Sequence, residues 1–286
     1  MSGSLLLLFV FLSAFLAPPL SRLLRMPVPV GELVIGLLLG HFLAQGVALP
    51  EILGFLADFG FLLLMFLAGL EVDFNLLRQL ERRHFVFYAL YVVGMFLGAG
   101  LLAGLLGVGL AQALILALVS IGLMVATLRD MGILGRAFAK RVLILGVLGE
   151  VASLFGLTAM EKAAHYQGLL SLLKEVGIIA PFFLLLFLAF RLAGLFLWWY
   201  PEAGRRPVYE EDPSAMGIRL SLALMFAAAV MSGLVGLESV LGAFLAGMIL
   251  SYFLQKKHDL EAKLSAMGYG FLIPIFFIRT GMGIDL

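Results

Sequence analysis

Long apolar runs alternate with short polar segments along nearly the whole chain, and this pattern predicts an all-α membrane protein. About 20 predominantly apolar residues are enough to cross a bilayer as a helix. Ten segments reach or approach that length: 4–20, 28–47, 52–71, 84–107, 109–128, 141–160, 176–200, 216–235, 237–254 and 264–286. We expect prolines to end the first helix (Pro18, Pro19), open the second (Pro27, Pro29) and kink or break the tenth (Pro274).

Positively charged residues collect in every second connection between these runs. The connections that carry them contain Arg22 and Arg25; Arg78, Arg82 and Arg83; Arg129, Arg136, Lys140 and Arg141; Arg205, Arg206 and Arg219; and Lys256, Lys257 and Lys263. The connections between them hold no Lys or Arg except Lys162 and Lys174. Because cytoplasmic loops carry such an excess, we predict a multi-pass plasma (inner) membrane protein with its N-terminus outside.

The composition agrees with a membrane protein and argues against several other classes. Of the 286 residues, 63% are hydrophobic and 13% are charged, whereas soluble domains carry about 25% charged residues. A formal net charge of +1 gives no reason to expect a nucleic-acid partner. Cysteine is absent and the four histidines are widely spaced, so we expect no disulfide, no cofactor and no resident metal. The sequence shows no nucleophile–base pattern, so we do not expect an enzyme.

One acidic residue, Glu150, lies inside the sixth apolar run and is the only ionisable residue between Arg141 and Glu161. A charge at mid-membrane costs about 2.5–3.5 kcal/mol on insertion scales, so such a residue faces protein or water and suggests a functional site. The alternative is a neutral carboxyl group that only holds two helices together. Because burial favours the neutral form of a carboxylate, Glu150 could hold a proton in one state and release it to a cation in another.

Two pairs of runs resemble each other in the same order along the chain. The third run ends in Gly69-Leu-Glu-Val-Asp-Phe and the tenth in Gly281-Met-Gly-Ile-Asp-Leu. In the run before each, Glu32 and Gly36 match Glu238 and Gly242. The tenth helix follows the third by seven, and an odd shift reverses orientation. The pattern therefore predicts inverted-topology repeats, which are typical of secondary transporters.

This repeat divides the chain into unequal parts. We assign 1–200 to the first half, with core ion-site helices in 109–160, then 201–217 to a cytoplasmic connector and 218–286 to the start of the second half. Three further runs, 84–107, 109–128 and 141–160, follow the third run up to and including the one that carries Glu150, whereas the chain stops directly after the counterpart of the third run at Leu286. We therefore expect the second repeat to lack three helices, either as a fragment or by nature.

Several stretches resemble the monovalent cation:proton antiporter-2 family of bacterial Na+/H+ exchangers and K+ efflux transporters. They are VPVGELVIGLLLG (28–40), LADFGFLLLMFLAGLEVDF (56–74), TLRDMG (127–132) and FLIPIFFIRTGMGIDL (271–286). The resemblance covers most of the chain in the family's order. It implies an inverted-repeat fold with a dimer-forming domain and an ion-translocating core, elevator-like alternating access, and exchange of Na+ or K+ for H+. It also implies about three further helices.

The chain departs from the family's pattern at two places. The family's ion-site helix usually carries two adjacent polar or acidic residues, where this chain has Gly149 and Glu150. The broken helix nearby usually carries two polar residues, where this chain has Val119 and Ser120. The resemblance therefore implies that Glu150 binds cation and proton in turn and that Ser120 is the remaining hydroxyl ligand. So few oxygen ligands argue against tight Na+ coordination.

Other residues near this site have two interpretations each. Gly122 could permit unwinding or close packing, and Ser153 could share the face of Glu150 or bond back to its own helix. Asp58 could line a funnel or form a hydrogen bond near the membrane face. Arg279 could partner Asp58 or Glu150, although snorkelling to the interface is favoured.

The remaining charged candidates have structural interpretations. Glu32 and Glu238 stand where their helices begin, and a carboxylate there favours the helix dipole. Asp130 next to Arg129 indicates an ion pair in a loop.

The leading hypothesis is a secondary active transporter, a homodimer in the lipid bilayer, that exchanges Na+ or K+ for H+ at Glu150. One carboxylate without an acidic neighbour predicts one cation for one proton, and so electroneutral exchange. One alternative is a non-transporting regulatory or degenerate membrane fragment, for which the expected loss of three helices is the main argument. The other is a sodium-coupled organic-anion carrier on a related fold, against which the FLAGLEVDF and TLRDMG stretches count.

Overall fold

The computed structural model describes residues 3–43, 50–72, 82–134, 136–165, 188, 215–234, 238–253 and 258–284, and all its regular elements are helices. In chain order they are α1 (Gly3–Leu23), α2 (Val28–Leu43), α3 (Glu51–Leu70), α5 (Arg82–Leu106), α6 (Leu110–Leu116), α7 (Ile121–Asp130), α8 (Ala137–His165), α11 (Met216–Leu234), α12 (Ser239–Phe253), α13 (His258–Met267), η1 (Gly268–Leu272) and α14 (Ile273–Met282). Nine of the ten predicted runs coincide with these elements, which confirms the all-α class. The seventh run and most of the predicted connector lie outside the described residues.

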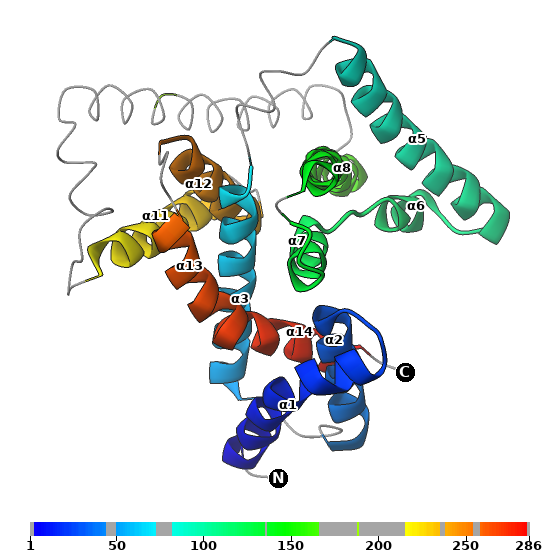
Figure 1. The fold of residues 1–286 in the computed structure, drawn as a ribbon. Helices are drawn as coiled ribbons and strands as arrows, with labels where there is room; N and C mark the ends of the chain where they lie inside the picture. The colour runs from blue at the N-terminus through cyan, green and yellow to red at the C-terminus, as the bar shows by residue number, and fades with distance from the viewer. Residues whose placement is uncertain are drawn as a thin grey trace.

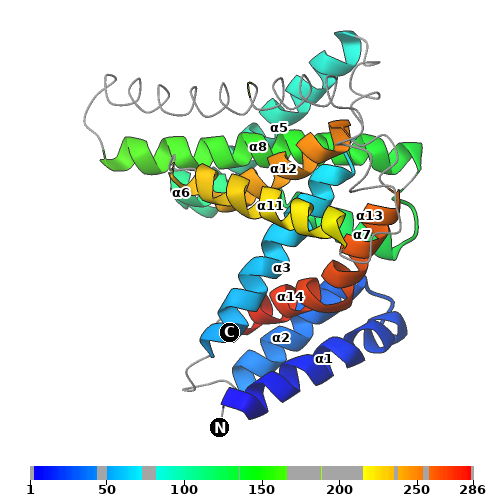
Figure 2. The same ribbon diagram turned by 90° about the vertical axis from the view of Figure 1, so that its left-hand side faces the viewer.

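The helices form two groups (Figures 1 and 2). One contains α1, α2, α3 and α11–α14, and the other contains α5–α8, with α8 packed on α5, α6 and α7. The second group contacts the first mainly through α7, which packs on α2 and α3. Six of the described helices or helix combinations are long and apolar enough to cross a membrane.

Helix α3 is the centre of the larger group. It packs against α12, α14 and α7, and every residue from Leu63 to Leu70 is buried. A helix that is apolar on all sides is stable only where neighbours surround it. By contrast, α5 presents large apolar side chains such as Leu97 and Leu105 to the surroundings, as a lipid-facing helix does.

Proline has different effects in two of the helices. The prediction that Pro18 and Pro19 end the first helix is wrong, because α1 continues through both to Leu23. Membrane helices tolerate such prolines when local adjustments satisfy the freed backbone groups. Before Pro274 the helix widens into the π-helical turn η1, whose end is marked by the bond from Ile273 N–H to the Gly268 carbonyl oxygen. The predicted perturbation at Pro274 therefore takes the form of a π turn.

The fifth predicted run is a discontinuous helix. α6 ends at Leu116, the chain is extended at Ser120 (φ −107°, ψ 104°), and α7 begins at Ile121. The four residues between them interrupt the helical bonding ladder. Their backbone groups need other partners, because an unpaired polar group is costly in a membrane interior.

The crossing of α12 on α3 depends on two glycines. A Cβ added to Gly247 would collide with the carbonyl oxygen of Phe66, and one added to Gly69 would collide with that of Phe244. Only the missing side chains allow the two backbones to approach this closely. Such contacts favour helix association in lipid, where packing replaces the hydrophobic effect.

The crossing of α14 on α2 depends on glycine–carbonyl contacts of the same kind. A Cβ at Gly36 would collide with the carbonyl oxygen of Ile278, and one at Gly281 would collide with that of Leu33. Both crossings therefore place one glycine from each helix against a carbonyl oxygen of the other.

These contacts give a register between the two crossings. Residues of α3 correspond to residues of α14 that lie 212 positions later, namely Phe66 to Ile278 and Gly69 to Gly281. Residues of α2 correspond to residues of α12 that lie 211 positions later, namely Leu33 to Phe244 and Gly36 to Gly247. The predicted pairing of Gly36 with Gly242 differs from this contact register by five residues, because Gly242 approaches Ala228 of α11 instead. The matched contacts are those that an inverted repeat requires, and the repeat itself stays a prediction.

We expect Gly36→Ala to destabilise the protein, because its methyl group meets backbone atoms that cannot rotate away. The free energy of unfolding should fall by about 1–3 kcal/mol, the usual cost of overpacking. Thermal unfolding in detergent measures the effect. The matched control is Gly94→Ala in α5, where nothing lies within 4 Å of the added Cβ. Equal stability of the two variants would contradict the proposed role of the close crossing.

Candidate functional site

Glu150 lies in the middle of α8, half-buried and directed at the discontinuous helix. Its Oε2 accepts a hydrogen bond from the Ile121 N–H at 3.0 Å. Ile121 is the first residue of α7, so the carboxyl group occupies the N-terminal end of that helix. The first N–H groups of a helix have no partner within it, and Glu150 supplies one from a neighbouring helix.

The position also suits a negative charge. The N-terminal end of a helix carries a partial positive charge that favours anions. Ser120 stands at the same end and caps α7, since its Oγ accepts a hydrogen bond from the Leu123 N–H at 3.4 Å. Ser120 itself is exposed. The structure therefore shows the predicted hydroxyl as a helix cap beside Glu150.

Ser153 contacts the end of the break that follows α6. Its buried hydroxyl lies 2.9 Å from the carbonyl oxygen of Ala117, which follows α6, and 2.6 Å from that of Gly149 in its own helix. The structure therefore agrees with both interpretations of Ser153, because its hydroxyl contacts Gly149 within α8 and also Ala117 on the face that carries Glu150. The hydroxyl brings a donor to the carbonyl end of α6, where helices lack donors.

Glu150 and Ser153 together hold the break from a single helix face. They are three residues apart, so they project from the same side of α8. One accepts from the first amide of α7 and the other donates at the end of α6. A backbone interruption that is costly in lipid is in this way stabilised by two side chains of α8.

A glycine beside Glu150 could leave room for an ion or a water molecule, but Gly149 leaves no open space there. A Cβ added there would lie 3.1 Å from Val119 Cγ2 and 3.5 Å from the hydroxyl of Tyr91. Val119 and Gly149 are therefore a complementary pair, at two positions where the resemblance implies polar residues. Tyr91 in α5 is a neighbour of the site that sequence reasoning missed, because no spacing rule links α5 to α8.

At Gly122 the structure agrees with the interpretation that this glycine permits close helix packing. It is the second residue of α7, and an added Cβ would lie 3.0 Å from Leu64 and 3.3 Å from Met65 of α3. Its small size lets α7 approach α3 closely. The glycine therefore fixes the position of the helix whose N-terminal end carries Glu150.

Asp58 and Arg279 are not joined to this site in the described part of the chain. Asp58 is exposed on α3, and Arg279 is half-buried near the end of α14. No hydrogen bond or ion pair between described residues links either of them to Glu150.

Glu32 and Asp130 differ from their predicted structural roles, whereas Glu238 stands at the start of its helix as predicted. Glu32 is the fifth residue of α2 and only 3% exposed, so it does not cap the start of the helix. Glu238 is exposed and precedes α12. Asp130 is the last residue of α7, and its Oδ2 accepts a hydrogen bond from the Val28 N–H at 3.0 Å. The predicted pairing of Asp130 with Arg129 is absent among the described residues, where Arg129 lies over the Tyr269 ring instead.

The arrangement at Glu150 can bind one small positive species. A carboxyl group at a helix break can accept a proton or offer oxygen to a cation, and half-helix ends commonly form such sites in transporters. No group of three or more metal-ligating side chains occurs among the described residues. The chemistry therefore depends on Glu150 and on nearby hydroxyl and carbonyl oxygens.

We expect Ser153→Ala to lower the free energy of unfolding by about 1–3 kcal/mol, because it leaves the buried Ala117 carbonyl oxygen without this donor. Ser221→Ala is the matched control, since Ser221 is equally buried but bonds only to Gly217 in its own helix. That variant should cost less than about 1 kcal/mol. Thermal unfolding in detergent compares them, and equal losses would show that the contact across the break contributes nothing.

Comparison with known proteins agrees with the resemblance drawn from the motifs. The chain is 27% identical to the putative Na+/H+ antiporter YjbQ of Bacillus subtilis, over 98% of this chain and 47% of that protein. It is 29% identical to the probable Na+/H+ antiporter 3 of Methanocaldococcus jannaschii, over 96% of this chain and 70% of that protein. The glutathione-regulated potassium-efflux system protein KefC of Escherichia coli O45:K1 is 28% identical, over 96% of this chain and 44% of that protein.

The chain thus spans about half the length of the first of these relatives. The family model described as "Sodium/hydrogen exchanger, transmembrane" matches residues 11–286, nearly the whole chain. This family consists of transporters, in agreement with the prediction that the chain is not an enzyme. The match includes α6, α7 and α8, which form the helix break and carry Glu150. The chain belongs to the sodium/hydrogen exchanger family.

Proposed function

We propose that this protein exchanges a monovalent cation for a proton across the membrane and that Glu150 binds the two in turn. The observation that carries the proposal is the Glu150 carboxyl group at the first amide of α7, inside a helix break. Family membership supports the reaction class, since relatives bear the names of Na+/H+ antiporters and a potassium-efflux protein.

The cost of an isolated charge explains why a single carboxylate enforces exchange. An ionised carboxylate without a partner in a low-dielectric interior is strongly disfavoured. Glu150 is then stable with a proton bound or with a cation bound, and least stable with neither. The empty site has the highest free energy, so the protein changes between its outward-facing and inward-facing states only when Glu150 is occupied. If a proton occupies Glu150 in one direction, a cation must occupy it in the other.

The Ile121 amide contributes in both states. It donates to one carboxyl oxygen of Glu150, and a carboxyl group can accept that bond whether or not its other oxygen carries a proton. The second oxygen then takes the proton or faces the cation. The proposed additional oxygens come from Ser120 and the carbonyl groups of the break, while Gly149, Val119, Gly122 and Ser153 shape the site.

The stoichiometry follows from the neighbour of Glu150. Gly149 has no side chain, so the proposed site changes its charge by one when the proton leaves. One cation replaces one proton, and the exchange is electroneutral. Oxygen ligands suit both Na+ and K+, and the proposal covers both.

The two helix groups suggest the moving parts. We place α5–α8, which carry the site, in a core that moves against the group of α1–α3 and α11–α14. Their contact is largely confined to α7 against α2 and α3. The proposal includes a homodimer in the plasma (inner) membrane with the N-terminus outside, as the loop charges predict.

We expect Glu150→Gln to abolish exchange and to leave folding intact. Glutamine keeps the shape and can still accept from the Ile121 N–H, but it cannot release a proton or carry a charge. Proton flux driven by a Na+ or K+ gradient should fall to the level of protein-free liposomes. The measurement uses the full reading frame that contains this chain, reconstituted in proteoliposomes.

Glu238→Gln is the control for that experiment, because Glu238 is exposed and precedes α12. Its flux should match that of the unaltered protein. Undiminished flux in Glu150→Gln, with normal unfolding temperature, would reduce Glu150 to a structural contact and remove the central residue of the proposal.

Restoring an acidic pair should strengthen cation binding only if Val119 is also changed. Gly149→Asp with Glu150→Asp adds a carboxylate but places its Cβ against Val119 Cγ2. We expect this double variant to lose about 1–3 kcal/mol of stability through overpacking. Adding Val119→Ser should restore stability, lower the half-saturating cation concentration and make the flux sensitive to membrane potential. Full stability without Val119→Ser would contradict the packing argument.

A further inference from the structure

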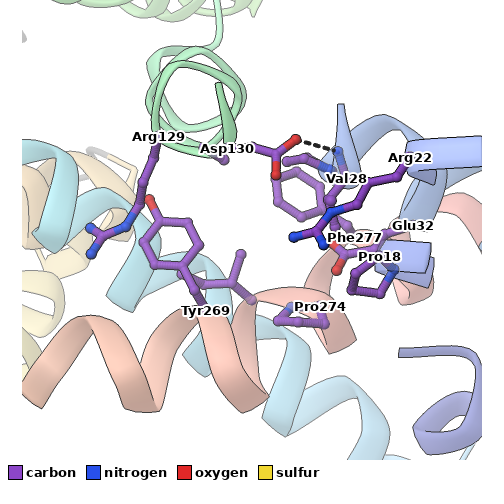
Figure 3. A pocket seen from close by; sticks show the side chains of 12 residues that line it. Pro18, Arg22, Val28, Glu32, Arg129, Asp130, Tyr269, Pro274 and Phe277 are labelled. Carbon is purple, nitrogen blue, oxygen red and sulfur yellow. Dashed lines mark hydrogen bonds between the residues drawn. The ribbon is translucent and has the colours of Figure 1, made fainter. Parts of the chain in front are cut away.

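A second cluster of charged side chains lines a cavity well separated from Glu150 in sequence and at the opposite end of α7. The cavity has a volume of about 240 Å³ and lies where α1, α2, α7, η1 and α14 meet. Figure 3 shows Arg22 and Glu32 on one side of it and Arg129 and Tyr269 on the other. Its remaining wall is largely apolar and includes Pro18, Pro274 and Phe277.

Glu32 is the deepest charged group of this cluster. It is 3% exposed and lines the cavity, and no hydrogen bond to it occurs among the described residues. The Tyr269 hydroxyl, also in the cavity wall, is buried beside the Arg129 side chain. Buried polar groups in native proteins nearly always have partners, so the buried Glu32 carboxyl group facing this cavity indicates that something occupies it.

The surrounding charges disfavour a metal ion as the occupant of this cavity. Arg22 and Arg129 both line the cavity, and their positive charges oppose a bound Na+ or K+. Arg22 is exposed at the rim, where solvent screens it, and Arg129 is held 4.6 Å from the centroid of the Tyr269 ring. A proton neutralises the Glu32 carboxylate itself and needs no further ligands. Water, at about 30 Å³ per molecule in the liquid, fits the cavity and can deliver it.

Asp130 connects Glu32 to the docking of α7. The Asp130 carboxylate lies close enough to Glu32 for their negative charges to repel. The same carboxylate accepts the bond from the Val28 N–H at the start of α2, and this bond joins the two helix groups. The titratable or charged groups that face Glu32 are therefore Arg22 from α1, Arg129 and Asp130 from α7, and Tyr269 from η1; the part of α14 that lines the cavity contributes none.

We propose that this cavity is a proton-binding site, distinct from Glu150, in which Glu32 takes up a proton and so stabilises the docking of α7 on α2. With Glu32 neutral, Asp130 keeps its bond to Val28. With Glu32 charged, repulsion between the carboxylates weakens that bond and releases the end of α7. Docking is then strongest at low pH and is lost as the pH rises through the titration of Glu32. The consequence for transport rests on the proposed function, whereas the docking itself does not.

The test measures docking directly and does not require transport. Residues 1–286 contain no cysteine. Leu24→Cys and Met131→Cys, both at exposed positions, therefore place two spin labels across the contact, in a full-length protein whose other cysteines, where present, are replaced by serine. Distances between the labels report the docked population between about pH 5 and about pH 9. We expect the ratio of docked to undocked protein to fall about two- to fivefold over this range, the size typical of partly exposed carboxylate pairs.

Three variants decide the outcome. Glu32→Gln and Asp130→Asn each remove one of the two repelling charges, and either should make the docked population independent of pH. Glu150→Gln should retain the response, because the proposed site is separate. The proposal is overturned if the unaltered labelled protein shows no pH response, if either Glu32→Gln or Asp130→Asn keeps it, or if Glu150→Gln removes it. A pH response in unaltered protein that shows no cation/proton exchange would uphold this site and refute the proposed function.

Discussion

The structure around Glu150 depends on one requirement, that the backbone groups freed by the break between α6 and α7 find partners away from water. Unpaired amides and carbonyls are costly at membrane depth, so a broken helix is stable only beside suitable side chains. α8 provides an acceptor at the start of α7 and a donor at the end of α6. The carboxyl group proposed to bind ions is therefore also part of what stabilises the break.

This double role constrains how the site can vary. A residue at position 150 has to accept the hydrogen bond from Ile121, and for the proposed exchange it must also gain and lose a proton. Glutamine can do the first but not the second. At position 149 the limit is steric, since Val119 already fills the space above Gly149. The two departures that the resemblance implies, at positions 149 and 119, therefore face each other in the structure.

The sequence predicted the helices well because apolar runs of membrane-spanning length leave few alternatives. It failed where the outcome depended on segments distant in sequence. Glu32 at the start of its helix suggested a cap, but α1 and α14 bury it, and no local pattern shows that. Likewise the predicted repeat matched Gly36 with Gly242, whereas the packing contacts match Gly36 with Gly247, and both glycines of 237–254 fit the sequence pattern. Glu150 was recognisable because an isolated charge in an apolar run is rare.

α7 brings the two charged sites into one rigid element. At its N-terminal end Ile121 meets Glu150, and at its C-terminal end Asp130 meets α2. Ten helical residues span about 15 Å, and the helix packs on α3 between these ends through Gly122. If this short helix moves as a unit, a change in docking at Asp130 would displace the amide that Glu150 contacts. The proposed proton site near Glu32 and the proposed ion site at Glu150 lie at opposite ends of the same helix, so any coupling between them must be mutual.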